Sequence, residues 1–175
     1  MGTEPLETAV ADAGPLIHLT EIKSISFLRL FAQIHIPQMV WSETVGKGRV
    51  MENDISVLGN IKMEYPDQAE VIRFVKDNAL EDLHAGERES LYVCQQTGVN
   101  LVLTDDLAVR KAAKRLKATP VGSLGIVIRA YKAGLISLEE ATQRISDLQT
   151  TSTLFVTRAI VELAIEELHR RVNIN

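Results

Sequence analysis

Short apolar segments that end in aspartate alternate with helix-forming patterns along this chain. Residues 8–12 form one such segment, which ends at Asp12, and residues 99–103 form another, which is closely followed by Asp105 and Asp106. Nearly continuous apolar strands are typical of a parallel sheet that helices cover on both faces. The alternation therefore predicts the α/β class, as a three-layer α/β/α domain with a central, mainly parallel sheet.

Apolar periodicity and turn residues place the other elements. Further strands are expected at residues 34–36, 60–65 and 119–121. Helices are expected at residues 25–31, 67–78, 86–98, 109–116, 124–131, 137–148 and 155–168, and another after Pro37 carries Glu43. Residues 46–60 carry no pattern that assigns them to a helix or a strand.

The composition narrows the class of protein. With 175 residues and 46% hydrophobic side chains, the chain can bury the core of a compact domain. Its single cysteine, Cys94, excludes an intramolecular disulfide and a multi-cysteine zinc site. No apolar stretch approaches the roughly 20 residues of a membrane helix, and the first residues are not basic, so a cytoplasmic protein without membrane contact is expected.

The net charge of −4 argues against a surface that attracts nucleic acid over long distances. Binding of RNA would therefore need a local contact, or a metal ion that masks the acids. One predicted helix face is basic and offers such a contact to phosphates, through Arg110, Lys111, Lys114 and Arg115. The alternative is an ordinary solvated helix face.

Acidic residues gather at predicted positions that suit a binding site. The carboxyl ends of parallel strands meet at one edge of a sheet, which places Asp12 near Asp105 and Asp106. Glu43 and Glu87 lie on helices beside apolar residues, and Glu87 falls on the inward stripe with Leu91 whereas Glu89 falls off it. Because this set offers oxygen ligands without histidine or cysteine, it suits hard cations such as Mg²⁺ or Mn²⁺.

Each acid also has a purely structural alternative. Asp12 before Gly14 is suited to a turn or a helix N-cap. Glu43 has the features of a solvated helical glutamate, and Glu87 is suited to the positive end of its own helix. The Asp105-Asp106 pair is suited to capping the next helix. Their common placement at one sheet edge favours the functional interpretation.

Four motifs occur in order, namely Val10 to Ile17, Ile36-Pro37 with Val40 to Glu43, Gly86 to Glu89, and Leu103 to Asp106 followed by Arg110. From about Thr8 to Leu135, this ordered set resembles the PIN domain. More narrowly, it is similar to a prokaryotic branch of PIN-domain ribonucleases, the VapC-like toxins of type II toxin-antitoxin pairs. The resemblance implies a PIN-like domain over residues 1–135 and a C-terminal helical extension over residues 136–175, packed on the same domain or on a partner.

The resemblance also implies roles for these residues. The proposed catalytic acids are Asp12, Glu43, Glu87, Asp105 and Asp106, and the proposed metal ligands are Asp12, Asp105, Asp106 and Glu87. The fourth family acid falls on Asp105 or Asp106, because spacing from Thr104 favours Asp106 and the strand end favours Asp105. Proposed substrate contacts come from Thr104, Arg110, Lys111 and Lys114. One departure is Gly14, where many relatives carry serine or threonine.

The resemblance implies an Mg²⁺- or Mn²⁺-dependent endoribonuclease that uses one or two ions and acts on RNA phosphodiester bonds. It further implies a homodimer and a possible antitoxin protein as partner. A second hypothesis is a catalytically weak or inactive PIN-like module that binds RNA or protein, which Gly14 and the helices after Ser137 favour. A domain that uses an aspartyl phosphate has little support, because Asp12 lacks an Asp-x-Asp arrangement.

Overall fold

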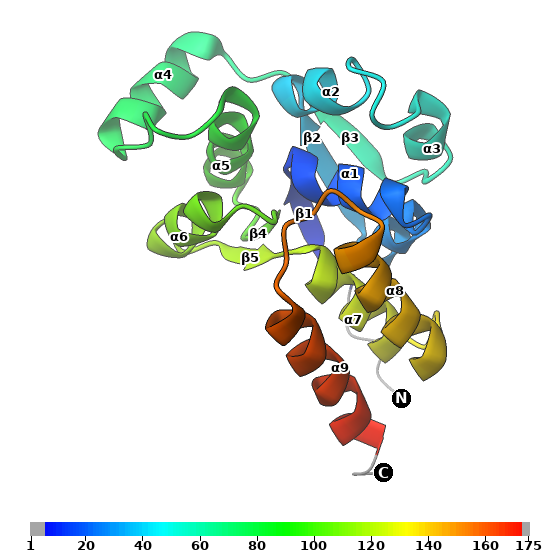
Figure 1. Ribbon diagram of the computed structural model, residues 1–175. Coiled ribbons are helices and arrows are strands. Elements are labelled where there is room, and N and C mark those ends of the chain that lie inside the picture. Colours follow the sequence, from blue (N-terminus) through cyan, green and yellow to red (C-terminus); the bar gives the residue numbers. More distant parts are fainter. Residues whose placement is uncertain (1–5, 173–175) are drawn as a thin grey trace.

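The central sheet has five parallel strands. The computed structural model describes residues 6–172 (Figure 1). The strands are β1 (Thr8–Ala11), β2 (Gln33–Pro37), β3 (Ile61–Glu64), β4 (Leu101–Leu103) and β5 (Thr119–Val121), in the order β3-β2-β1-β4-β5. Every neighbouring pair is parallel. The predicted parallel α/β sheet is therefore confirmed.

Helices cover both faces of the sheet. They are α1 (Ala13–Glu21), α2 (Gln38–Thr44), α3 (Glu52–Ser56), α4 (Gln68–Asp77), α5 (Ala85–Thr97), α6 (Leu107–Arg115), α7 (Ser123–Lys132), α8 (Leu138–Thr150) and α9 (Arg158–Val172), with a 3-10 helix η1 (Ile25–Leu30). In Figure 1, α4, α5 and α6 lie on one side of the strands and α1, α7 and α8 on the other. This arrangement confirms the three predicted layers.

Alternation along the strands divides the core between these two layers. Ala9 and Ala11 pack with α1, α7 and α8, whereas the intervening Val10 packs with α4, α5 and α6. Val102 in β4 faces the same side as Val10. Because successive side chains of a strand point to opposite faces, apolar residues at every position require cover on both sides.

The C-terminal helices join the core of the domain. Ile145 and Leu148 of α8 and Leu168 of α9 are fully buried in the cluster that includes α1 and α7. The boundary predicted at residue 135 stays a prediction. No helix within residues 6–172 is long and apolar enough to cross a membrane.

The last helix begins later than expected. The helix predicted from Phe155 starts at Arg158, and residues 153–157 are not helical. Thr153 donates its backbone N–H to Glu21 of α1 over 2.7 Å, and the Thr157 hydroxyl accepts the N–H of Ile160 over 3.4 Å, as an N-cap residue does. A tertiary contact thus replaces the expected first turn.

Candidate active site

A pocket of about 820 Å³ opens at the carboxyl edge of the sheet. All five acids singled out from the sequence line it, namely Asp12, Glu43, Glu87, Asp105 and Asp106. Asp12 follows β1 and Asp105 and Asp106 follow β4, while Glu43 lies on α2 and Glu87 on the first turn of α5. The crossover topology therefore brings together side chains that are up to 94 positions apart, since the set extends from residue 12 to residue 106.

Asp12 is the most buried acid in this pocket. Only 4% of the residue is exposed, and its carboxylate accepts the Ala13 N–H at 2.7 Å and the Thr104 hydroxyl at 2.8 Å. Burial raises the pKa of Asp12 from 3.8 to about 6, against those two hydrogen bonds, and the charges of Glu87 and Glu43 raise it further. The site therefore holds this carboxylate at a cost in electrostatic energy.

Glu87 and Glu43 come from the two helices that pack beside each other. Partial burial raises the pKa of Glu87, and the charges of Asp106 and Glu43 add to the rise. Glu87 also closes a capping box by accepting the His84 N–H at 2.8 Å. Glu43 accepts the Gly86 N–H at 3.3 Å, and a Cβ at position 86 would lie only 2.7 Å from its carboxylate. Glycine at position 86 therefore lets Glu43 approach the start of α5.

Asp105 has a different environment from the other acids. Its Oδ1 accepts the Ser123 N–H at 2.7 Å, and its Oδ2 lies 2.6 Å from the Ser123 hydroxyl and 2.7 Å from His18 Nδ1. A Cβ at Gly122 would lie 2.7 Å from Oδ1, so glycine is needed for this close approach. With both oxygens engaged, Asp105 holds α1 and α7 in place at the pocket wall.

Asp106 and Thr104 complete the sequence-predicted triplet. Asp106 is exposed and caps α6 through Oδ1, which accepts the N–H groups of Ala108 and Val109 at 2.7 and 2.9 Å. Thr104 is fully buried, and its hydroxyl points at Asp12 rather than into the pocket. The structure therefore leaves Asp106 freer than Asp105 to meet a ligand, and gives Thr104 a supporting position.

The basic residues divide into those near the pocket and those remote from it. Arg110 donates to the Thr104 carbonyl at 3.2 Å, whereas Lys111 and Lys114 are exposed on α6 and do not line the pocket. Lys47 and Arg49, which the sequence analysis did not single out, line it from the loop after α2. The lysine and arginine that line the pocket therefore come from a segment to which no structure was assigned from the sequence.

The prediction that Glu89 lies off the inward face of its helix is wrong. Glu89 is 1% exposed and accepts the Met39 N–H at 2.9 Å and the Gln68 amide at 2.6 Å. It stabilises the first turn of α2, because an acid at a helix N-terminus satisfies free N–H groups. The apolar stripe alone could not identify this position, since a buried carboxylate is compatible with the core only when it finds donors.

Two residues that sequence analysis missed lie against Asp105. His18 lines the pocket one helical turn after Gly14, so the i, i+4 spacing on α1 contained the signal. Ser123 directly follows β5 and Gly122, at the same sheet edge as the acids. The rule that polar residues after parallel strands converge there could have found it.

The donor set fits a hard divalent cation in its chemistry. Within residues 6–172, none of Asp12, Glu43 and Glu87 forms an ion pair with lysine or arginine, so their charge is not neutralised by the protein. Carboxylate oxygens are ligands that Mg²⁺ and Mn²⁺ prefer, and no thiolate or imidazole is needed beside them. In the same range, however, no three histidine, cysteine, aspartate or glutamate side chains are gathered closely enough to form a metal cluster.

Comparison with known families gives one match. The model described as DUF3368: PIN domain matches residues 8–170, which is most of the chain and includes the helices after residue 135. No curated protein and no solved structure gave a significant match.

Proposed function

Because the chain belongs to the PIN-domain family, whose members are generally nucleases that use divalent metal ions, we propose that it is an Mg²⁺- or Mn²⁺-dependent endoribonuclease. One observation carries the proposal. Asp12 is buried with a pKa raised to about 6, faces the pocket shared with Glu43 and Glu87, and has no cationic partner among the described residues. A divalent cation is the counter-charge that this arrangement lacks.

In the proposed reaction, some residues of the chain hold the metal and others position those residues. Asp12, Glu43, Glu87 and Asp106 would hold one or two ions, directly or through water. Bound Mg²⁺ or Mn²⁺ lowers the pKa of a coordinated water and stabilises negative charge on a phosphodiester. Thr104 orients the Asp12 carboxylate through its 2.8 Å hydrogen bond. Asp105 takes the role of a positioning residue, because it fixes His18 and Ser123 at the wall.

We propose RNA as the substrate from the resemblance to PIN-domain ribonucleases. Lys47 lines the pocket with the carboxylates and supplies positive charge for the phosphates of such a chain, and Arg49 lines it while paired with Glu21 at 3.6 Å. From the resemblance to VapC-like toxins we further propose a homodimer that serves as the toxin of a type II pair, with an antitoxin protein as its partner.

The test is cleavage of RNA by the purified protein. A single-stranded RNA of mixed sequence is incubated with EDTA, Mg²⁺ or Mn²⁺, and with an Asp12→Asn variant as the matched control. The proposal predicts internal cleavage that needs the metal and is lost in the variant. Cleavage that persists in EDTA, or that is equal in Asp12→Asn, would contradict it.

A second candidate is a PIN-like module that binds RNA or protein without cleaving it. Two observations favour this alternative, the lack of a three-ligand cluster within residues 6–172 and the engagement of both Asp105 oxygens. Thermal unfolding distinguishes the two. The nuclease is stabilised by millimolar Mn²⁺, because a ligand of the folded state adds RT ln(1 + [L]/Kd) to its stability. The inactive module is not stabilised.

A further inference from the structure

An extended segment before the last helix passes beside the acidic pocket. Residues 152–157, here called the strap, link α8 to α9 (Figure 1). The strap is fixed at both ends. Thr153 donates its N–H and its hydroxyl to Glu21 at 2.7 and 2.9 Å, and Thr157 accepts the Ile160 N–H at the start of α9. These contacts hold the residues between them in a defined position.

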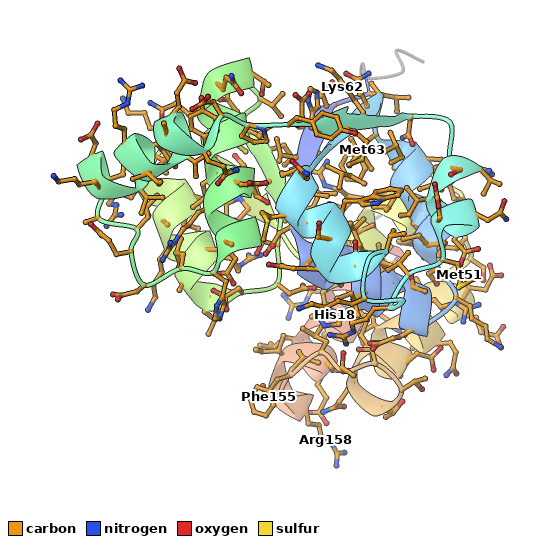
Figure 2. The ribbon with its side chains drawn as sticks, turned by 90° about the horizontal axis from the view of Figure 1, so that it is seen from above. His18, Met51, Lys62, Met63, Phe155 and Arg158 are labelled. Carbon is orange, nitrogen blue, oxygen red and sulfur yellow. The ribbon has the colours of Figure 1, made fainter. Side chains whose placement is uncertain are left out.

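Phe155 projects from the middle of the strap into solvent. Its side chain is 94% exposed, the largest value among the exposed apolar residues of the described chain. Figure 2 shows it at the outer edge of the molecule, on the same side as His18. Phe155 lines both the acidic pocket and a second hollow of about 570 Å³, so it stands at the junction of the two. The ring therefore presents both faces to a ligand that would cross from the acidic pocket into the second hollow.

The second hollow is lined by apolar and basic residues. Three cations line it, Arg110, Arg129 and Lys132, and among the described residues of its lining the one acid is Asp105, whose oxygens are already engaged. Arg129 pairs with Glu7 and Arg110 donates to a backbone carbonyl, so Lys132 is the least committed of the three. The excess of positive charge beside an apolar wall is complementary to a chain that carries both phosphates and bases.

We propose that Phe155 stacks on one unpaired base of a single-stranded RNA, next to the phosphate that enters the acidic pocket. The adjoining nucleotide then lies along the second hollow, with its phosphate near Lys132. This inference rests on the proposed function and specifies its substrate as single-stranded. Bases inside a duplex are already stacked on both faces, whereas an unpaired base offers its face to an aromatic ring. Stacking does not depend on the hydrogen-bond donors and acceptors of the base, so the subsite accepts all four bases.

Equilibrium binding of RNA in Ca²⁺, an oxygen-preferring cation that can neutralise the carboxylates in place of Mg²⁺, tests the subsite, with gel analysis to verify that the probe stays intact. The probe is a single-stranded RNA of about ten nucleotides, within the usual site sizes, with 2-aminopurine at one position. Phe155→Ala weakens binding about 5- to 150-fold, the equivalent of losing one base–aromatic stack. Phe155→Trp retains the affinity. The matched control is Leu163→Ala on α9, because Leu163 is 62% exposed but lines neither hollow.

The fluorescence of 2-aminopurine reports stacking directly, which a merely structural role of Phe155 would not change. Binding to wild-type protein and to Phe155→Trp changes this fluorescence, and Phe155→Ala removes the change. Equal affinities of wild type and Phe155→Ala, absence of binding by the wild type, or equal loss with a duplex probe would overturn the inference. So would a change of oligomeric state in Phe155→Ala with unaltered RNA binding, because Phe155 would then serve a protein interface.

Failure of this inference is distinguishable from failure of the proposed function. Metal-dependent cleavage by wild type, together with normal RNA binding by Phe155→Ala, would contradict only the stacking subsite. Normal stacking without metal-dependent cleavage would contradict only the proposal of nuclease activity.

Discussion

Asp12 and Asp105 end neighbouring parallel strands, yet their environments are opposite. Asp12 follows β1, is almost completely buried and has two acids near it that raise its pKa further. Asp105 follows β4 and has donors from Ser123 and His18 on both oxygens. Both oxygens of each carboxylate accept a hydrogen bond, but Asp12 has two donors and acidic neighbours, whereas Asp105 has three donors that come from α1 and α7.

The difference separates binding from positioning within one pocket. An acid whose burial and acidic neighbours outweigh its hydrogen bonds is available to an added cation, whereas an acid whose donors tie two helices to the pocket wall stabilises the elements around it. Substitution of each carboxylate by its amide should therefore change stability in opposite directions.

The largest expected effect is on cleavage by Asp12→Asn. Loss of a metal ligand removes several kcal/mol of transition-state stabilisation, which corresponds to a fall in kcat/KM of at least about 10³-fold. In metal-free protein at neutral pH, the same change raises stability by up to about 3 kcal/mol, because it removes an ionised group whose pKa is raised. The amide nitrogen cannot accept one of the two hydrogen bonds from Ala13 and Thr104, which reduces this gain by about 1 kcal/mol. Cleavage kinetics and urea unfolding measure the two effects. An Asp12→Asn variant that is both active and less stable than wild type would contradict the proposed difference between Asp12 and Asp105.

Asp105→Asn should lower both activity and stability. The amide cannot accept hydrogen bonds from His18 and from both Ser123 donors at once, and a buried donor without a partner costs about 1–3 kcal/mol. As a positioning residue, Asp105 should contribute about 10- to 100-fold to cleavage, less than Asp12. Ser123→Ala is the matched control, since it removes one of the same hydrogen bonds. A rise in unfolding free energy for Asp105→Asn would show that its charge is unfavourable as well.

The stability of metal-free protein should depend on pH through Asp12. Its pKa is about 6 when folded and near 3.8 when unfolded, so the folded state binds more protons between these values. The favourable contribution is full below pH 4 and is lost as pH rises to 6 and beyond, by on the order of 2 kcal/mol. The difference in unfolding free energy between wild type and Asp12→Asn isolates the titration of Asp12 and of its coupling to Glu43 and Glu87, because groups that do not interact with Asp12 cancel. A difference that is constant from pH 4 to pH 7 would contradict the assignment.

Gly14→Ser should have the smallest effect. A Cβ at position 14 would lie 3.4 Å from the Asp105 Cβ and 3.6 Å from His18 Cε1, which are ordinary contacts. Ser123 already supplies a hydroxyl to Asp105. The change in unfolding free energy should stay within about 0.5 kcal/mol, and the cleavage rate should change less than tenfold, or about 1.4 kcal/mol. A large gain in activity would show that the missing hydroxyl limits this protein.

The sheet could be predicted because its strands leave a local signal. Continuous apolar runs such as Val10 and its neighbours need helices on both faces, and that requirement determines the class. The start of α9 could not be predicted, because it depends on a hydrogen bond between Thr153 and Glu21, 132 positions away. Apolar spacing continued through Phe155, but it carries no information about such a contact.

The candidate site could be located from the sequence, but the different environments of its acids could not be predicted. Five acids, at strand ends and on two helices, were expected near one another, and all five line the pocket. Whether an acid finds donors is decided by distant residues, as His18 and Ser123 do for Asp105 and as Met39 and Gln68 do for Glu89. Their roles in metal binding and catalysis stay predictions.

Calorimetric titration with Mn²⁺ tests most directly whether the Asp12 pocket lacks a counter-charge. Wild-type protein, Asp12→Asn and Asp105→Asn are titrated at neutral pH under identical conditions. We expect saturable binding to wild type, its loss in Asp12→Asn, and its retention in Asp105→Asn, because Asp105 holds α1 and α7 at the pocket wall and is not among the proposed metal ligands Asp12, Glu43, Glu87 and Asp106. Binding that is absent from wild type, or that is lost with Asp105 and kept without Asp12, would contradict the account.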